Sequence, residues 1–363
     1  MSFDKGTVNF TVLAPARKIE SLSSVIDDIM GEGYKQSSPS FETDIFDSTS
    51  GLSLADIVGR EVMEGDFKYG GIPYFAIRKR EKKIDTGLVK ERLERFIADA
   101  AQEGRVVSSK EKKAQKEVIV NSLAMDAQEK ISGNRVVISP DGSTIYLEAS
   151  SEKKVEELVE ILMSLIEYGK IGGGIGVVTP EFMATTLGYD PDAYEPIRVS
   201  EHEQIMGIGE DFLTYLFMAS EIKGYVDPFE ISLPGNINMV DCCSASSGAK
   251  KISMKDGLAS ISKEVISALK SGKKVESADF MIAEGDAAFS VTIDSQFHFK
   301  KLKMENMEDQ FDDKEGEFLA RVNAITKFTG IVETLLKQFL DRRSVLENVF
   351  QEWVSKKDTF LNS

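Results

Sequence analysis

The feature that most constrains the fold is a run of three strand-like segments joined by very short turns. The segments read KKVESADFMIA (273–283), AAFSVTID (287–294) and FHFKKLKM (297–304), with EGD and DSQ at their junctions. Apolar residues recur at alternate positions, which is typical of strands with one buried face. Turns this short connect antiparallel neighbours, because parallel strands need a crossover of a dozen or more residues. The sequence therefore predicts an α+β fold with antiparallel sheets and hairpins.

Further strand and helix patterns flank this meander. Strands are predicted at 7–12 and 72–78, and the turn Pro140-Asp141-Gly142 predicts a hairpin over 134–149. Apolar spacing predicts helices over 18–33, twice within 85–124, and over 152–168, 179–188, 210–222, 262–272 and about 317–340, with Trp353 in a terminal helix. We expect three regions: an N-terminal α+β region with a basic helical pair (1–168), an irregular middle insertion (169–249) and a C-terminal α+β region (250–363).

The two helices within 85–124 are long, amphipathic and rich in Lys and Glu. The predicted inward positions of the first are Val89, Leu93, Phe96, Ile97 and Ala100. The second opens on Ser108 and Glu111, which have the spacing of a capping box, and its predicted inward positions are Ala114, Val118 and Ala124. This pattern leaves Lys90, Lys112 and Lys116 on outward faces.

Charge is distributed unevenly along the chain. There are 44 Lys and Arg against 60 Asp and Glu, a formal net charge of -16. From Arg78 to Lys116, 13 basic and 7 acidic residues give +6, so the remainder sums to -22. From Lys250 to Lys274, 7 basic and 2 acidic residues give +5. An anionic chain repels DNA at long range, so binding to DNA would require a local basic surface.

The residues that usually carry catalysis or metal binding form no motif in this sequence. His202 and His298 are far apart, and the adjacent Cys242 and Cys243 lack the spacing of a zinc site, so structural roles are predicted for all four. The glycine-rich run 168–178 leaves a helix and enters VVTP, which differs from a phosphate-binding loop and predicts a connector. We expect no cofactor. Neither a signal peptide nor a membrane span is apparent, so a cytoplasmic protein is expected.

One acidic cluster leaves an enzymatic alternative open. Asp309, Asp312, Asp313 and Glu315 could hold Mg²⁺ in a metal-dependent nuclease. The same carboxylates precede a long predicted helix, where negative charge favours the N-terminal end of the helix dipole. The helix-start interpretation is the preferred one.

The basic run itself has two interpretations from composition alone. Alternating Lys and Glu on a helix is typical of a solvated face with pairs such as Glu91 and Arg95, and it also suits a phosphate-binding surface. The segment 76–123, from AIRKREKKI to QKEVIVNSL, resembles the RdgC family of recombination-associated DNA-binding proteins. The hairpin and helix RVVISPDGSTIYLEASSEKKVEELVEIL and the block 269–313 resemble it as well. The resemblance covers about 75–170 and 260–340, and the N-terminus weakly.

This resemblance implies a non-enzymatic homodimer, closed into a ring with a basic central hole. Such a ring encircles double-stranded DNA without reading sequence and limits RecA-dependent recombination, so a nucleoid-associated protein is expected. Matching segments suggest Lys90, Lys112, Lys116, Lys255, Lys273 and Lys301 as the DNA-binding residues.

The sequence also departs from the family pattern. Gln128 stands where the family carries an aromatic residue, and the loop 254–260 keeps only Lys255 of its basic residues. A third alternative is therefore a protein-interaction scaffold that has lost its affinity for DNA.

Overall fold

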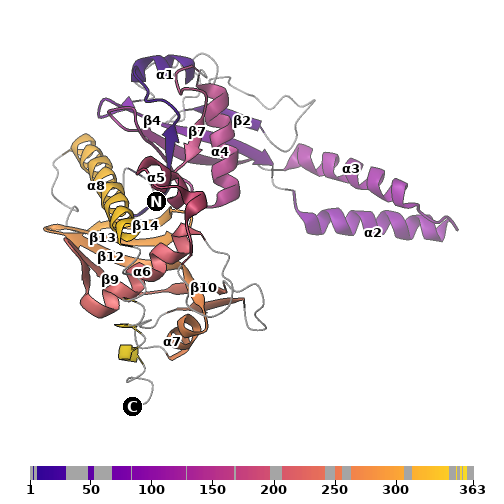
Figure 1. Ribbon diagram of the computed structural model, residues 1–363. Helices are drawn as coiled ribbons and strands as arrows, with labels where there is room; N and C mark the ends of the chain where they lie inside the picture. Colours follow the sequence, from indigo (N-terminus) through magenta and orange to yellow (C-terminus); the bar gives the residue numbers. More distant parts are fainter. Residues whose placement is uncertain are drawn as a thin grey trace. The chain divides into compact units, whose positions relative to one another are not determined.

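The computed structural model describes most of the chain (Figure 1). The described residues are 3, 6–29, 48–52, 68–82, 84–127, 129–166, 169–196, 207–241, 250–255, 263–305, 313–342, 349, 352–353 and 355–357. Within them, none of the helices combines the length and apolarity that crossing a membrane requires.

The chain forms two compact units that are interleaved in sequence. Unit 1 comprises Met1–Leu22, Lys68–Pro73 and Val136–Ser363, and unit 2 comprises Ser23–Phe67 and Tyr74–Arg135. This division differs from the three consecutive regions expected from the sequence, because the chain leaves unit 1 early and returns to it late. The segment 169–249, expected to be an irregular insertion, contributes regular helices and strands to unit 1 in its described part.

Unit 1 is built on an antiparallel sheet with the strand order β11-β10-β12-β13-β14-β1-β6-β5. These strands are β11 (Lys251–Met254), β10 (Ile237–Asp241), β12 (Lys273–Glu284), β13 (Ala287–Asp294), β14 (His298–Glu305), β1 (Val8–Pro15), β6 (Ile145–Leu147) and the last three residues of β5 (Glu129–Ile138). Short strands extend it: β7 (Ile175–Val177) pairs with β1, β9 (Phe229–Ser232) with β12, and β8 (Tyr225–Val226) with β9. The predicted meander is confirmed as β12, β13 and β14, and the predicted hairpin as β5 and β6.

Alternation along the meander separates an apolar face from a polar face. The register pairs Phe280 with Val291 and Ala278 with Ile293, and all four are buried. The intervening positions carry Asp279 opposite Thr292, which are partly exposed. The two faces differ because successive side chains of a strand point to opposite sides of the sheet.

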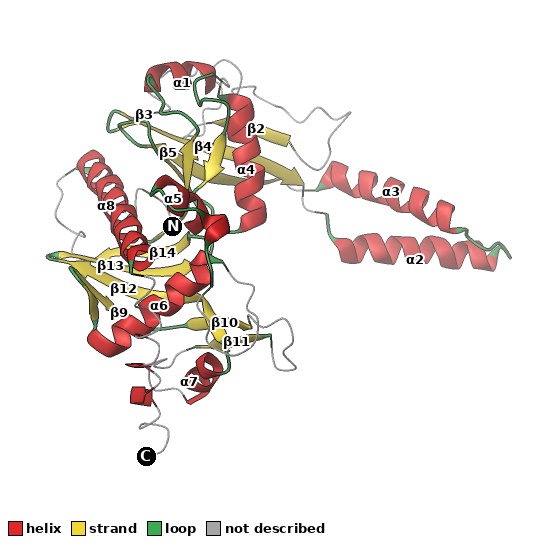
Figure 2. Ribbon diagram, in the orientation of Figure 1, coloured by secondary structure: helices red, strands yellow, loops and turns green. Residues whose placement is uncertain are grey.

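Helices cover the apolar face of this sheet (Figure 2). The helices of unit 1 are α4 (Glu152–Leu165), α5 (Pro180–Thr186), the short 3₁₀ helix η3 (Pro191–Ala193), α6 (Ile208–Lys223), α7 (Lys263–Lys270) and α8 (Lys314–Asp341). Phe328 of α8 packs on Phe289 and Phe299, with ring centroids 5.5 and 5.2 Å apart. Helix α6 is buried from Ile208 to Phe217 on nearly every side, as predicted from its apolar sequence. These contacts form the main core of the unit.

Charged groups also lie inside unit 1, at the start of β12. The Lys274 ammonium forms an ion pair with Asp211 of α6, and both side chains are fully buried. Asp211 also accepts a hydrogen bond from the Tyr194 hydroxyl at 2.7 Å. Breaking a buried pair of this kind by removing one partner is strongly destabilising, by about 3–5 kcal/mol.

Unit 2 contains a pair of helices and a few strands. Its described elements are most of α1 (Leu22–Asp28), β2 (Ser48–Leu52), most of β4 (Ile72–Lys82), α2 (Thr86–Gln102), α3 (Ser109–Asp126) and most of β5, and β4 pairs with β2. In unit 1, β3 (Lys68–Tyr69) pairs with the first two residues of β4. Helices α2 and α3 are antiparallel neighbours that pack chiefly on each other (Figure 1). We call this pair the helical hairpin.

Candidate nucleic-acid interface

Local hydrogen bonds fix where each helix of the helical hairpin begins. The Asp85 carboxylate caps α2 by accepting from the Gly87 amide at 2.7 Å. The predicted capping box is present on α3: the Ser108 amide donates to Glu111 at 2.9 Å, and the Glu111 amide donates to the Ser108 hydroxyl at 3.3 Å. Hydrogen bonds from Ser108 and then Arg105 hold the pKa of Glu111 below its usual value. The caps place the lysines that follow on regular helical backbone.

The buried side of α2 matches the prediction, whereas that of α3 does not. In α2, Val89 and Ala100 are buried, and the other predicted inward residues are partly buried. In α3 the buried residues are Ile119 and Ala124, while Val118 is 59% exposed. Ala114 is exposed as well, so the predictions of Ala114 and Val118 as inward residues are wrong, whereas that of Ala124 is confirmed. Helix α3 is rotated about its axis relative to the expected orientation, because its contact with α2 uses Ile119.

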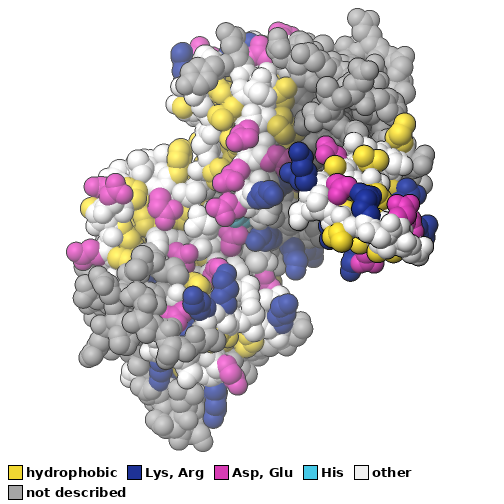
Figure 3. All heavy atoms as spheres, turned by 90° about the vertical axis from the view of Figure 1, so that its right-hand side faces the viewer, with side chains coloured by type: hydrophobic (Ala, Val, Ile, Leu, Met, Phe, Trp, Pro, Cys, Tyr) yellow, Lys and Arg dark blue, Asp and Glu magenta, His cyan; other side chains and the backbone are white. Residues whose placement is uncertain are grey.

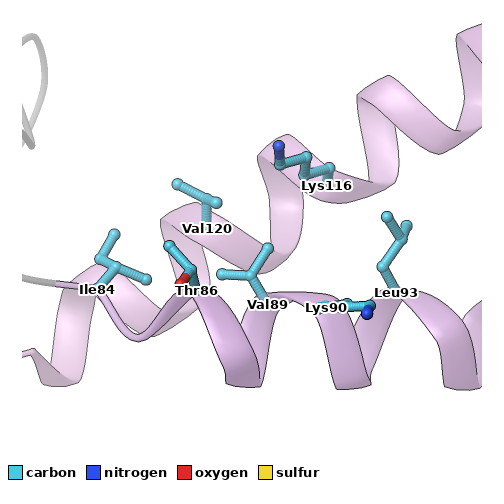
Figure 4. A pocket seen from close by; sticks show the side chains of 7 residues that line it. All are labelled: Ile84, Thr86, Val89, Lys90, Leu93, Lys116 and Val120. Carbon is cyan, nitrogen blue, oxygen red and sulfur yellow. The ribbon is translucent and has the colours of Figure 1, made fainter. Parts of the chain in front are cut away.

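This rotation gathers three of the predicted lysines on one side of the helical hairpin. Lys90 of α2 and Lys116 of α3 line the same pocket (Figure 4). Lys112 precedes Lys116 by one helical turn, and all three side chains are exposed. Lys90 lies 3.8 Å from Glu94, a pair in which both side chains are mostly exposed. Such an exposed pair contributes little to stability, so Lys90 can exchange Glu94 for another anion.

Lys112 and Lys116 are available to an external anion. Within the part of the chain that the structure describes, neither ammonium has a carboxylate within ion-pair distance. Lysine ammoniums on regular helices suit contact with phosphates, which position a duplex without reading its bases. The side chains of the basic run from Arg78 to Lys83 lie outside the described residues.

Two other predicted lysines are exposed on the sheet of unit 1. Lys301 lies in an irregular part of β14, with φ of 54°, and its amide donates to the Asn9 side chain at 2.6 Å. Lys255 follows β11 directly. The strands β10, β12 and β13 separate β11 from β14, so at about 4.8 Å per strand these lysines belong to different parts of the sheet.

Lys273 requires a correction. Its side chain is 9% exposed, and its ammonium lies 3.4 Å from the Asp241 carboxylate, which is 6% exposed. A lysine buried in an ion pair is not available to a phosphate, so Lys273 does not belong to the surface proposed from the sequence. Its burial follows from its place at the start of β12, paired in register with Asp241 of β10.

The structure adds a cluster that the sequence did not indicate. Asp294 at the end of β13 accepts from Lys300 at 2.9 Å and lies 3.2 Å from His298 Nδ1. Burial alone would raise the pKa of Asp294, but the hydrogen bonds and charges of His298 and Lys300 outweigh it and lower that pKa. The available signal was the placement of His298 and Lys300 two residues apart on one strand, and hence on one face.

Only part of the predicted acidic cluster lies among the described residues. Asp313 caps α8, accepting a hydrogen bond from the Gly316 amide at 2.6 Å, which confirms the helix-start interpretation for this residue. Asp309 and Asp312 lie outside the described residues, as do His202 and both cysteines. Among the residues described, no group of three His, Cys, Asp or Glu side chains is arranged to hold a metal ion.

The visible surface in Figure 3 intersperses Lys and Arg with Asp and Glu. On this face, the described basic residues thus lie among acidic ones. At physiological salt the screening length is about 8 Å, so a local patch acts on phosphates that approach it closely.

Comparisons with known proteins point to one family. Residues 62–174, which include β4, the helical hairpin and α4, match the family model described as "Putative exonuclease, RdgC". The recombination-associated protein RdgC of Psychromonas ingrahamii is 26% identical over 298 residues, 80% of each chain. The RdgC proteins of Shewanella oneidensis and Shewanella sediminis are 32% identical over 109 residues and 39% identical over 85 residues. Those matches cover 30% and 23% of this chain, and 34% and 28% of the relatives.

Proposed function

We propose that this chain belongs to the RdgC family and that it binds double-stranded DNA without reading its sequence, as a non-enzymatic, ring-shaped homodimer. By occupying DNA it would limit RecA-dependent recombination, as a nucleoid-associated protein of the cytoplasm. The relatives are named for their association with recombination, which supports the pathway part of the proposal.

The observation that carries DNA binding is the lysine side of the helical hairpin. Lys90, Lys112 and Lys116 are exposed there, on helices whose starts are fixed by caps. Two of these ammoniums have no carboxylate partner among the described residues, so binding a phosphate would not require breaking an existing pair. Lys255 and Lys301 would contribute separately from the sheet of unit 1.

A second observation supports a homodimer. Leu88, Val118 and Met125 are 45%, 59% and 72% exposed on the helical hairpin. At 100° per residue, each lies on the opposite side of its helix from the residues that line the pocket beside Lys90 and Lys116. The helical hairpin buries few residues of its own, so its exposed apolar side chains favour contact with another protein surface. We assign this surface to a second copy of the chain.

The test of DNA binding is a double charge reversal. Lys112→Glu with Lys116→Glu should weaken binding of a fluorescent duplex by at least about 100-fold at low salt, because two phosphate contacts become repulsive. Anisotropy measures the affinity, and circular dichroism checks the fold. The matched control, Lys153→Glu with Lys314→Glu, makes the same change in net charge at two other exposed lysines.

Equal weakening in both double variants would show that only net charge matters and would remove Lys112 and Lys116 from the interface. The same binding reactions run with Mg²⁺ or Mn²⁺ should return the duplex intact. Shortened duplex would favour the alternative, a metal-dependent nuclease, which the exonuclease description of the family model also raises. Failure of the parent protein to bind the duplex would favour the scaffold alternative.

A further inference from the structure

The helical hairpin holds a pocket of about 460 Å³ between its two helices (Figure 4). Its lining residues are Ile84, Thr86, Val89, Lys90, Leu93, Lys116 and Val120. The volume lies within the range of binding sites for small groups, about 300–1,000 Å³. We propose that this pocket binds an acidic peptide of a partner protein, taking one bulky apolar side chain between the helices and pairing the peptide's carboxylates with Lys90 and Lys116.

The pocket exists because a lysine takes a position that packing would give to an apolar residue. Lys116 and Val120 are one turn apart on the side of α3 that faces α2. Val120 stays between the helices, whereas the long Lys116 side chain reaches solvent and leaves the space beside Val89 and Leu93 unfilled. A space lined by aliphatic groups loses packing contacts, and an apolar side chain would restore them.

The positive charge at the rim of the pocket favours an acidic peptide as the ligand. Lys90 and Lys116 flank an apolar interior, and Lys112 lies one turn beyond Lys116. Among the described residues, the ion pair of these three lysines is Lys90 with Glu94, which is 3.8 Å long and mostly exposed, so an incoming carboxylate can replace it. A neutral or basic peptide would leave these ammoniums without the pairing that an acidic peptide provides.

The lining argues against a nucleobase as the occupant. Unstacked bases bind on aromatic side chains or on Arg, and the groups inside this pocket are aliphatic, with a threonine and two lysines. Aliphatic walls instead match the apolar side chain of a peptide. The outward surface of Leu88, Val118 and Met125 lies on the far sides of the helices, so the pocket is separate from the surface assigned to the second copy.

One consequence rests on the proposed function. Lys90 and Lys116 would contact both the peptide's carboxylates and the phosphates of DNA, so an acidic partner would compete with DNA at this side of the helical hairpin. Peptide binding itself does not depend on DNA binding, and the two are measured separately.

The experiment uses the full chain without DNA and a fluorescein-labelled decapeptide with four aspartates around a central phenylalanine. At low salt, anisotropy should show saturable binding. Replacing the phenylalanine with alanine, or the aspartates with asparagine, should weaken binding by at least about tenfold, the factor expected for loss of about 1.4 kcal/mol. A duplex-binding assay on the same preparation separates failure of this inference from failure of the proposed function.

Two variants test the pocket, and a third serves as their control. Thr86→Phe should fill the pocket from an exposed position, and Lys90→Gln with Lys116→Gln should remove the rim charges. Each should weaken binding of the phenylalanine peptide at least tenfold. Lys110→Gln with Lys113→Gln removes two exposed charges of α3 outside the pocket lining and should leave binding within about twofold. Thermal unfolding checks that every variant is folded.

Several results would overturn the proposal. These are no binding by the parent chain, equal binding of the phenylalanine and alanine peptides, or an equal loss in the Lys110 and Lys113 variant. If Thr86→Phe leaves peptide binding unchanged but turns a dimer into a monomer, the pocket belongs to a second copy. If it leaves peptide binding unchanged but weakens binding of a single-stranded oligonucleotide, the occupant is a nucleobase.

Discussion

Lys273 and Lys274 are neighbours in sequence, yet each lies in a separate buried ion pair. Their partners, Asp241 and Asp211, are 32 and 63 residues away. The sequence alone does not distinguish such a buried lysine from a surface lysine, because only the tertiary structure brings its ion-pair partner close. The sequence therefore predicted the exposed Lys90, Lys112 and Lys116 as solvent-facing, and it misplaced Lys273.

At the same scale, the Asp294 cluster gives a prediction about pH. Its pKa is lowered in the folded protein, so its contribution to stability is present above the unfolded pKa of about 3.9 and is lost as pH falls through the lower folded value. Asp294→Asn removes this contribution and leaves Lys300 without its carboxylate partner. The difference in unfolding free energy between the parent and the variant should shrink as pH falls below ~4. Denaturant unfolding at several pH values measures it, and a difference that grows on acidification would contradict this account.

At the scale of elements, the sequence was sufficient to predict those features that depend only on neighbouring residues. The Ser108 capping box, the Thr179 and Pro180 helix start, and the β12–β14 meander were all predictable, because each depends on residues close in sequence. The rotation of α3 was not predictable, since Val118 and Ile119 are both apolar and the contact with α2 decides which is buried. The pocket beside Lys116 follows from that rotation, so it was missed as well.

The exposed side of the helical hairpin gives a prediction about assembly. Replacing Leu88, Val118 and Met125 together with serine should convert the proposed dimer into a monomer, because these exposed side chains would be covered in the dimer. Light scattering coupled to gel filtration measures the mass. Serine replacements at Met163 and Tyr225, exposed apolar residues of unit 1, serve as the control and should leave a dimer. A parent chain that is monomeric at every concentration would remove the ring from the proposal.

At the scale of the whole molecule, a formal charge of -16 coexists with local basic surfaces. The sequence predicted this contrast from the +6 of residues 78–116, because charge counts need no tertiary structure. It did not predict the two interleaved units, since strands and helices distant in the chain complete unit 1. The similarity to RdgC proteins and the exposure of the lysines together make phosphate contact the central claim.

The most direct test of that claim is the salt dependence of duplex affinity. If Lys90, Lys112 and Lys116 of two copies each neutralise one phosphate, the logarithm of the association constant should fall against the logarithm of salt concentration with a slope of about -5. Anisotropy titrations of unrelated duplex sequences should give the same slope and similar affinities. An affinity that stays constant between low and physiological salt would contradict the account.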